Sequence, residues 1–226
     1  MLDLLTDDSG HECQRLLEVG CGTGNHSRAF ASHDLSVTAV DIDVEMIASA
    51  QAAGSHDRVA FIAGPVEQVS GDQFDGAAAM FNVVNYVTDR AALVSMFHAI
   101  AIRLRPSSSF VFDCWNGVAA LIDPPRNEVR DFLSGGWSYH VEMTATTDPM
   151  RQLVEVRNQF EAEGPDGERH HFSNRLLHRL WTPAELTDVA MEAGFTSLRF
   201  MRWMLPNEQA TAEDWKIMAI AGPDKL

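Results

Sequence analysis

Residues 15–24 read Arg-Leu-Leu-Glu-Val-Gly-Cys-Gly-Thr-Gly, a short apolar run followed by three glycines spaced two apart. The run predicts a buried strand, and the pattern of residues 25–32 predicts a helix directly after the glycines. Glycines let the backbone turn tightly and approach a ligand, and free N–H groups at a helix start can face a carboxylate or phosphate. The stretch therefore predicts a strand, a ligand-binding turn and a helix.

The spacing of the glycines distinguishes two kinds of nucleotide-binding loop. A dinucleotide fingerprint, G-x-G-x-x-G, needs a third glycine at position 25 when counted from Gly20, or at position 27 when counted from Gly22. The chain has Asn25 and Ser27 there. The spacing disfavours NAD, so a nicotinamide-dependent oxidoreductase ranks last among the functional hypotheses.

Asp41 follows the second predicted strand, residues 36–40, and lies 17 residues after Gly24. An acid at this place can accept hydrogen bonds from both hydroxyls of a ribose, which indicates a nucleoside-bearing cofactor. The alternative is that Asp41 or Asp43 caps the next helix. Assigning the cap to Asp43 leaves Asp41 free to bind a ligand.

Strand and helix patterns alternate along the first half of the chain. Strands are predicted at 15–19, 36–40, 59–62, 76–81 and 110–114, and helices at 25–32, 43–54 and 89–104. This alternation predicts an α/β fold, a doubly wound Rossmann-like parallel sheet with helices on both faces. Two closing strands are predicted at 196–203 and 215–221.

Residues 137–181 change to polar-apolar alternation. Stretches at 139–146, 153–162 and 170–181 are separated by turn sequences, which predicts an antiparallel β insertion at about 125–181. Thr182-Pro183-Ala184-Glu185 then predicts a capped helix that ends before Gly194. The whole chain, 1–226, is predicted to be a single domain.

With 17 Lys and Arg against 32 Asp and Glu, the 226-residue chain carries a formal charge of −15. Such a field repels a phosphate backbone, so we expect no nucleic-acid partner. It favours cationic ligands such as a sulfonium or an amine, although solubility alone also explains it. The sequence has no apolar run of membrane-helix length and no basic flank of a secretory signal, so the expected location is the cytoplasm. The spacing of His and Cys predicts no metal site and no disulfide.

The pattern E-x-G-x-G-x-G, with an acid ending the second strand, resembles the class I methyltransferases that use S-adenosylmethionine (SAM). The resemblance runs from about Arg15 to the C-terminus. It implies a seven-stranded sheet that closes with an antiparallel hairpin, with SAM as cofactor and S-adenosylhomocysteine (SAH) as product. The glycine loop and Glu18 would surround the methionine portion, Asp41 would hold the ribose, and Ile42 would pack on the adenine. The residues assigned to the cofactor are Glu18, Gly20, Cys21, Gly22, Gly24, Asp41, Ile42, Met46, Gly64, Pro65, Val66 and Phe81.

The chain departs from this family at two places. Members often carry Gly-Asp after the third strand, whereas this chain has Gly64-Pro65-Val66, so the backbone at Val66 or the side chain of Glu67 would have to contact the adenine. Relatives usually carry a longer segment before the glycine loop, whereas residues 1–14 here are mostly polar and acidic. Three explanations for the shorter segment stay open. The acceptor sheet alone closes the cofactor site, a partner subunit in a possible homodimer contributes to closing it, or the chain is a shortened product.

Polar residues after the fourth and fifth strands are expected at the sheet edge where open α/β folds bind ligands. Within the resemblance, Asn82, Asn85 and Tyr86 would face the methyl acceptor. Alternatively, the two Asn form turns and Tyr86 covers the core. Asp113 would orient or deprotonate the acceptor, or would instead bond to backbone N–H groups of the following loop.

The insertion and residues 177–186 look like the sheet that covers the acceptor in methyltransferases of sugar nucleotides, including deoxyaminosugar N-methyltransferases. Side chains of this cover would line the acceptor site, or each could be structural, and an Arg there could pair with a phosphate. The predicted catalytic residues are Asp113, Tyr86 and His178. The predicted acceptor-binding residues are Asn82, Asn85, Tyr86, Trp115, Asn116, His140, Arg179 and Trp181.

The first functional hypothesis is therefore transfer of a methyl group to a small polar acceptor, an amine or hydroxyl of a sugar nucleotide or related metabolite. The second is a SAM-binding regulatory or inactive subunit without turnover, which the shorter N-terminal segment and the absent adenine Asp suggest. Turnover of SAM to SAH distinguishes the two.

Overall fold

The computed structural model describes residues 13–54, 56–71 and 73–222, so most of the predicted N-terminal stretch, residues 1–12, lies outside the described residues. Within the described ranges, eight strands form one sheet in the order β11-β10-β12-β5-β4-β1-β2-β3. The strands are β1 (Arg15–Val19), β2 (Ser36–Asp41), β3 (Val59–Ala63), β4 (Phe74–Ala79), β5 (Leu104–Trp115), β10 (Ser197–Arg202), β11 (Leu205–Gln209) and β12 (Lys216–Gly222). Strands β3, β2, β1, β4 and β5 run parallel, and β12, β10 and β11 add antiparallel pairs. This confirms the predicted doubly wound α/β fold.

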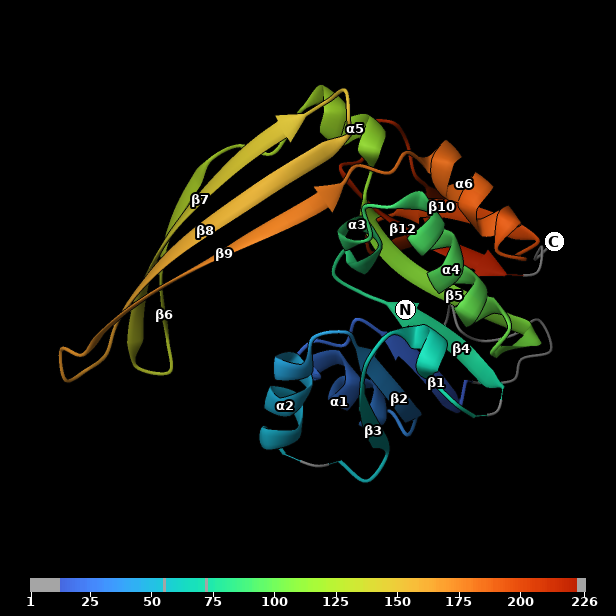
Figure 1. Ribbon diagram of the computed structural model, residues 1–226, viewed down its shortest axis with the longest axis horizontal. Helices are drawn as coiled ribbons and strands as arrows, with labels where there is room; N and C mark the ends of the chain where they lie inside the picture. Colours follow the sequence, from blue (N-terminus) through green and yellow to red (C-terminus); the bar gives the residue numbers. More distant parts are fainter. Residues whose placement is uncertain (1–12, 55, 72, 223–226) are drawn as a thin grey trace.

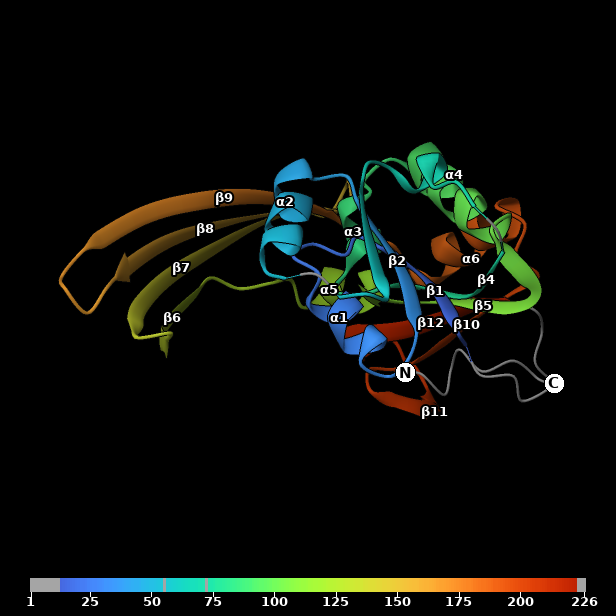
Figure 2. The same cartoon turned by 90° about the horizontal axis from the view of Figure 1, so that it is seen from below.

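Helices cover both faces of this sheet (Figures 1 and 2). The helical segments are α1 (Asn25–Ala31), α2 (Val44–Ala52), η2 (Val66–Gln68), α3 (Val83–Tyr86), α4 (Arg90–Ala101), α5 (Gly117–Ile122) and α6 (Pro183–Glu192). Leu16 and Leu17 are both fully buried, but Leu16 joins the cluster under α1 and α2, whereas Leu17 joins the cluster under α3, α4 and α6. Successive side chains of a strand point to opposite faces, so β1 supplies both cores.

Side-chain caps start the helices at the predicted places. Asp43 caps α2 by accepting from the backbone N–H groups of Glu45 and Met46. Thr182 and Glu185 form the predicted capping box of α6. Because Asp43 provides the cap, Asp41 is left to other partners, as predicted.

Several element boundaries differ from the prediction, and one strand of the eight-stranded sheet was not predicted. The helix α4 ends at Ala101, because Leu104 pairs with Phe74 as the first residue of β5. The register then shifts before Gly76 pairs with Ser109, and the extra residues of β5 accommodate Pro106 in an irregular stretch. Strand β4 ends at Ala79, two residues earlier than predicted. The added edge strand β11 has only exposed residues, so it lacks an apolar pattern.

The insertion forms a second antiparallel sheet that extends away from the body as a long curved arm (Figure 1). In the described chain its order is β6 (Glu128–Ser134), β7 (Trp137–Asp148), β8 (Leu153–Glu163) and β9 (Arg169–Arg179). We refer to residues 128–179 as the arm and to its end beside the body as the root. Strand β6 was not predicted, because all seven of its residues are exposed. Val154, Val156 and Leu180 pack with Ala120 to join the root to the body.

None of the helices in the described ranges is long and apolar enough to cross a membrane. Among the same residues, no three or more His, Cys, Asp and Glu side chains are grouped as metal ligands would be.

Candidate active site

The glycine loop lies at the carboxyl edge of the parallel strands and is tied to the end of β2. Gly20, Gly22 and Gly24 all have left-handed φ angles, of 71°, 53° and 76°. The Gly20 N–H donates to the Val40 carbonyl at 2.8 Å, and the Gly22 N–H donates to Asp41 Oδ2 at 2.7 Å. Only a residue without Cβ adopts such angles at little cost, so the loop requires its glycines.

Asp41 is half-buried and has one backbone donor on each carboxylate oxygen. Oδ2 accepts from Gly22, and Oδ1 accepts from the Asp43 N–H at 2.9 Å. Each oxygen keeps lone-pair capacity for a further donor, because an ionised carboxylate has about four acceptor sites. The group is thus oriented by the backbone and can still receive two hydroxyl groups.

Glu18 lies beneath the loop and is 1% exposed. Its Oε2 accepts from the Ser27 hydroxyl at 2.5 Å. Burial raises the pKa of Glu18 to about 7, against a smaller opposing effect of the Ser27 hydrogen bond. A carboxyl group held near its titration point can become ionised when a cationic group binds beside it.

Exposed apolar side chains surround the outer side of the loop. Ile42 is 77% exposed, Met46 is 42% exposed and Phe81 is 59% exposed, and the Phe81 ring lies 4.9 Å from the ring of His26. A Cβ added to Gly22 would meet no atom within 4 Å. The loop therefore faces open space flanked by apolar surface and Asp41, which fits an adenosyl group.

The segment after β3 has its Glu67 side chain tied to α4 through one carboxylate oxygen. Glu67 Oε1 accepts from the Ser95 hydroxyl of α4 at 2.8 Å, and the side chain of Val66 is buried in the core. Gly64 donates its N–H to the Asp41 carbonyl at 2.8 Å. Gly64 and Pro65 thus lie beside Asp41, and the backbone near Val66 and the side chain of Glu67 both stay alternatives for the adenine contact.

Asp113 is fully buried and both of its oxygens have partners. Oδ1 accepts from the Phe81 N–H at 2.5 Å, and Oδ2 pairs with Lys216 Nζ at 2.8 Å. Phe81 and Asn82, which follow β4, both have left-handed φ angles, of 66° and 62°. Asp113 thus largely fits the alternative interpretation, an acid that accepts from a backbone N–H group. The difference is that this N–H belongs to the loop after β4 and not to the loop after β5. Both carboxylate oxygens of Asp113 are therefore engaged by groups of the chain itself.

The side-chain amides of two predicted acceptor-binding residues are hydrogen-bonded to backbone groups. Asn85 is fully buried, its Nδ2 donates to the Arg179 carbonyl at 2.8 Å, and its Oδ1 accepts from the Trp115 N–H at 2.9 Å. Asn116 caps α5, and its Nδ2 donates to the carbonyls of Thr211 and Asp214. Both residues hold segments together and neither faces an acceptor.

Arg179 and Trp181 join the arm to α6. The Arg179 guanidinium contacts Gln152 at 2.6 Å and Glu185 at 3.4 Å, and it lies over the Trp181 ring. Trp181 is 1% exposed, and its Nε1 donates to the Val87 carbonyl at 3.0 Å. The indole is therefore part of the core. This corrects the prediction that Trp181 contacts the acceptor.

His140 lies toward the far end of the arm. Its Nδ1 contacts Asp131 at 2.7 Å, and this partner raises the pKa of His140. It pairs with Glu161, seven residues along β8 from Val154 at the root. At about 3.3 Å per residue this places His140 roughly 23 Å along the strand from Val154. His140 is not among the residues that line the cavity at the root.

A cavity of about 540 Å³ lies between the sheet edge and the root of the arm. It brings together four predicted residues, which are Asn82, Tyr86, Trp115 and His178. The prediction missed Arg126, Arg130, Met143 and Trp215, which also line it. Asn82 stands at the inner end, where one amide orientation lets Nδ2 donate to Asp113 at 3.3 Å and Oδ1 accept from Trp115 Nε1 at 3.1 Å. This cavity is the candidate acceptor site.

His178 packs between two aromatic rings in the wall of the cavity, stacked on Trp115 and tilted against Tyr86. Its ring centroid lies 4.5 Å from that of Trp115 and 4.6 Å from that of Tyr86. His178 is 3% exposed, and its buried Nδ1 has no hydrogen-bonding partner among the residues that the structure describes. Burial lowers the pKa of His178 to about 4, so the imidazole is neutral at pH 7.

Replacing His178 with Phe is expected to reduce the acid sensitivity of the fold. The unfolded chain protonates this ring near pH 6.5, whereas the folded chain does so near 4, so the folded state loses stability as the pH falls through this window. Phe keeps the stack and does not titrate. Urea denaturation at about pH 7 and about pH 5 should show a smaller drop in unfolding free energy than in the wild type.

The matched control is His140→Phe, because the pKa of His140 is raised rather than lowered. The raised pKa of His140 stabilises the folded state below the unfolded pKa, and this stabilisation is lost as the pH rises. Replacing His140 should therefore enlarge the drop in unfolding free energy between about pH 7 and about pH 5. An equal drop in His178→Phe and wild type would contradict the buried neutral imidazole.

Comparisons with known proteins bear on the glycine-loop half of the chain. Residues 16–107 match the sequence model of a family described as a methyltransferase domain. The Bacillus subtilis protein YqeM, named as a candidate methyltransferase, is 28% identical over 102 residues. That match covers 44% of this chain and 41% of YqeM, so the chain spans well under half of this curated relative.

Solved structures resemble nearly the whole chain. A SAM-dependent methyltransferase from Clostridium acetobutylicum aligns over 92% of this chain and 83% of its own, with a TM-score of 0.75 and 19% identity. CalS10 from Micromonospora echinaspora, an amino pentose methyltransferase with bound SAM, aligns over 92% and 83%, with a TM-score of 0.72 and 20% identity. Residues 16–107 thus match a methyltransferase domain, and the fold of the chain is that of the SAM-dependent methyltransferases.

Proposed function

We propose that the chain transfers a methyl group from SAM to an amine or hydroxyl of a small polar acceptor, such as a sugar nucleotide. The observation that carries the proposal is the position of residues 81–86. Phe81 lies on the glycine-loop side and contacts His26, whereas Tyr86 lines the cavity at the root of the arm. One short segment thus separates the proposed donor site from the proposed acceptor site.

The residues of the chain contribute binding and alignment. SAM, when bound, supplies an electrophilic methyl group on a sulfonium. Asp41 and the glycine loop would hold its nucleoside and amino-acid portions, and the cavity would hold the acceptor in line while excluding water. His178, with a pKa of about 4, is a weak base, and Asp113 is engaged with Lys216. Alignment of a neutral nucleophile is therefore the main contribution that these side chains support.

The cavity suits a small polar molecule with a flat or cyclic part. Its volume of about 540 Å³ is in the range of ligand sites for small molecules. Tyr86, Trp115 and Trp215 offer aromatic faces. Arg126 and Arg130 are paired with Asp123 and Glu128, but each guanidinium keeps further N–H donors for a phosphate. The name of CalS10 as an amino pentose methyltransferase supports an amine on a sugar. A homodimer and a single-domain organisation stay predictions.

Turnover tests the proposal directly. The chain is incubated with SAM labelled in the methyl group and with sugar nucleotides that carry or lack an amino group, and SAH and labelled product are measured. We expect SAH formation that depends on the added acceptor. Binding of SAM without turnover over the whole acceptor set would favour the regulatory alternative.

Asp41→Ala is expected to weaken SAH binding by about 1–3 kcal/mol, because hydrogen bonds to a charged group are lost. Calorimetric titration with SAH measures the effect. Asp43→Ala is the matched control, because it loses the cap of α2, costing about 1 kcal/mol of stability, but keeps its backbone N–H to Asp41. Wild-type affinity in Asp41→Ala would remove this acid from the binding site.

A further inference from the structure

Lys216 lies at the same edge of the sheet as the glycine loop, although it comes from the far end of the sequence. It is the first residue of β12 and pairs with Trp115, the last residue of β5. Its Nζ is 2.8 Å from Oδ2 of the buried Asp113, and the side chain stays 25% exposed. No sequence pattern assigned a role to this lysine.

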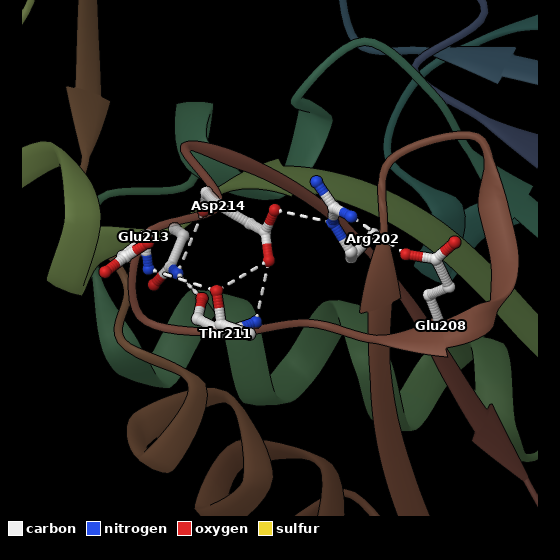
Figure 3. A network of polar contacts seen from close by, with 6 residues as sticks. Arg202, Glu208, Thr211, Glu213 and Asp214 are labelled. Atoms are coloured by element: carbon white, nitrogen blue, oxygen red, sulfur yellow. Dashed lines mark hydrogen bonds and ion pairs between the residues drawn. The ribbon is translucent and has the colours of Figure 1, made fainter.

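Aromatic rings and a polar network fix the position of this ammonium group. Nζ lies 3.8 Å from the centroid of the Trp203 ring and 5.1 Å from that of Phe81, which are cation–π distances. The loop before Lys216 is closed by Asp214, which accepts from the N–H and hydroxyl of Thr211 and pairs with Arg202 (Figure 3). The lysine is thus held in place.

The ammonium group has donors to spare. A lysine carries three N–H donors, and in the described part of the chain the only hydrogen-bonding partner of Nζ is Asp113. The ammonium group lies over the Phe81 ring, and this ring in turn contacts His26, two residues after Gly24. A continuous path of contacts therefore joins Lys216 to the glycine loop.

The charges along this path match a zwitterion. Glu18 lies under the loop as an acid that can become ionised beside an ammonium, and Lys216 lies beyond Phe81 as a cation with free donors. The amino-acid end of SAM or SAH carries an α-ammonium and a carboxylate. In a chain with a net charge of −15, a fixed cation with unused donors at this edge would attract a carboxylate.

We propose that Lys216, held by Asp113 and Trp203, binds the carboxylate at the amino-acid end of the cofactor. The inference rests on the proposed function, because it requires an adenosyl ligand on the glycine loop. It adds a cofactor-binding residue from β12 to those expected near the ends of β1, β2, β3 and β4. Asp113 acts through Lys216 and Phe81, and is a positioning residue.

The test compares two ligands that differ in the amino-acid end. SAH carries it, whereas 5′-methylthioadenosine has the same adenosine and thioether without it. In calorimetric titrations of the intact chain, Lys216→Met should weaken SAH by roughly ten- to hundredfold, the loss of a charge-assisted hydrogen bond. Binding of 5′-methylthioadenosine should change by less than about twofold. Lys216→Arg should recover part of the SAH affinity.

A second variant covers the case in which Lys216→Met does not fold because the buried Asp113 is left unpaired. Asp113→Asn with Lys216→Met removes both charges and keeps an oxygen acceptor for the Phe81 N–H, and it should show the same selective loss of SAH. Equal weakening of both ligands, or no weakening of either, overturns the inference. If the wild type binds neither ligand, the proposed function fails as well, so the two failures are distinguishable.

Discussion

Replacing Trp181 with alanine is expected to lower the free energy of unfolding by about 3–5 kcal/mol, the cost of deleting a large core side chain. The indole is 1% exposed and packs in the larger core cluster. Its loss also leaves the Val87 carbonyl without its donor and removes the ring beneath the Arg179 guanidinium. Urea denaturation followed by circular dichroism measures the change.

Two further variants separate the contributions. Trp181→Phe keeps an aromatic ring but loses the N–H, so it should cost about 1–3 kcal/mol, the price of an unpaired buried acceptor. Phe132→Ala removes an aromatic side chain that is 47% exposed on β6 and should stay within about 1 kcal/mol of the wild type. If Trp181→Ala lowered the free energy of unfolding as little as Phe132→Ala, the indole would be exposed to solvent. That is what the prediction that Trp181 contacts the acceptor required.

Gly20→Ala is expected to destabilise the fold by about 2–5 kcal/mol, from the cost of a left-handed residue together with overpacking. Gly20 has a φ of 71°, and an added Cβ would lie 2.5 Å from Val83 Cγ2 and 2.8 Å from Cγ1. Valine is stiff at χ1, so α3 would have to move. Because α3 carries Tyr86, the substitution should change both the stability of the fold and the lining of the proposed acceptor cavity.

Gly22→Ala is the informative comparison, because the two glycines differ in surroundings. Gly22 has a φ of 53°, but its added Cβ meets nothing within 4 Å. We expect a loss of only about 1–2 kcal/mol in stability. SAH binding should nevertheless be lost, because the methyl group would occupy the space where the cofactor is proposed to lie. Wild-type SAH affinity in a folded Gly22→Ala would show that the ligand does not lie against this loop.

Local signals predicted the features that depend on neighbouring residues. The glycine loop, the Asp43 cap and the Thr182 capping box each involve hydrogen bonds over a few residues or one strand-helix unit. A cap or turn is determined by side chains within a few positions, so the sequence pattern is enough to locate it. Strands β6 and β11 escaped prediction because all of their residues are exposed and no alternation marks them.

Residues around the acceptor site were harder to assign, because their partners are distant in sequence. Asn85 donates to the Arg179 carbonyl, 94 residues away, and Asn116 donates to the Thr211 carbonyl, 95 residues away. Both were correctly expected near the sheet edge, but their amides bond to backbone that no local pattern reveals. Lys216 was missed for the same reason. The available signal was a lysine directly before an apolar closing strand that pairs with the strand carrying Asp113.

The arm carries most of its buried large side chains at its root. Val154 and Val156 are buried there, whereas β6 and residues 169–175 of β9 are exposed. Amide hydrogens of the outer half are protected mainly by the strand ladder, so fraying should start at the tip and exchange with deuterium should be fastest there. Insertions, deletions and sequence drift at the tip can therefore accumulate without reshaping the walls that enclose the reacting groups.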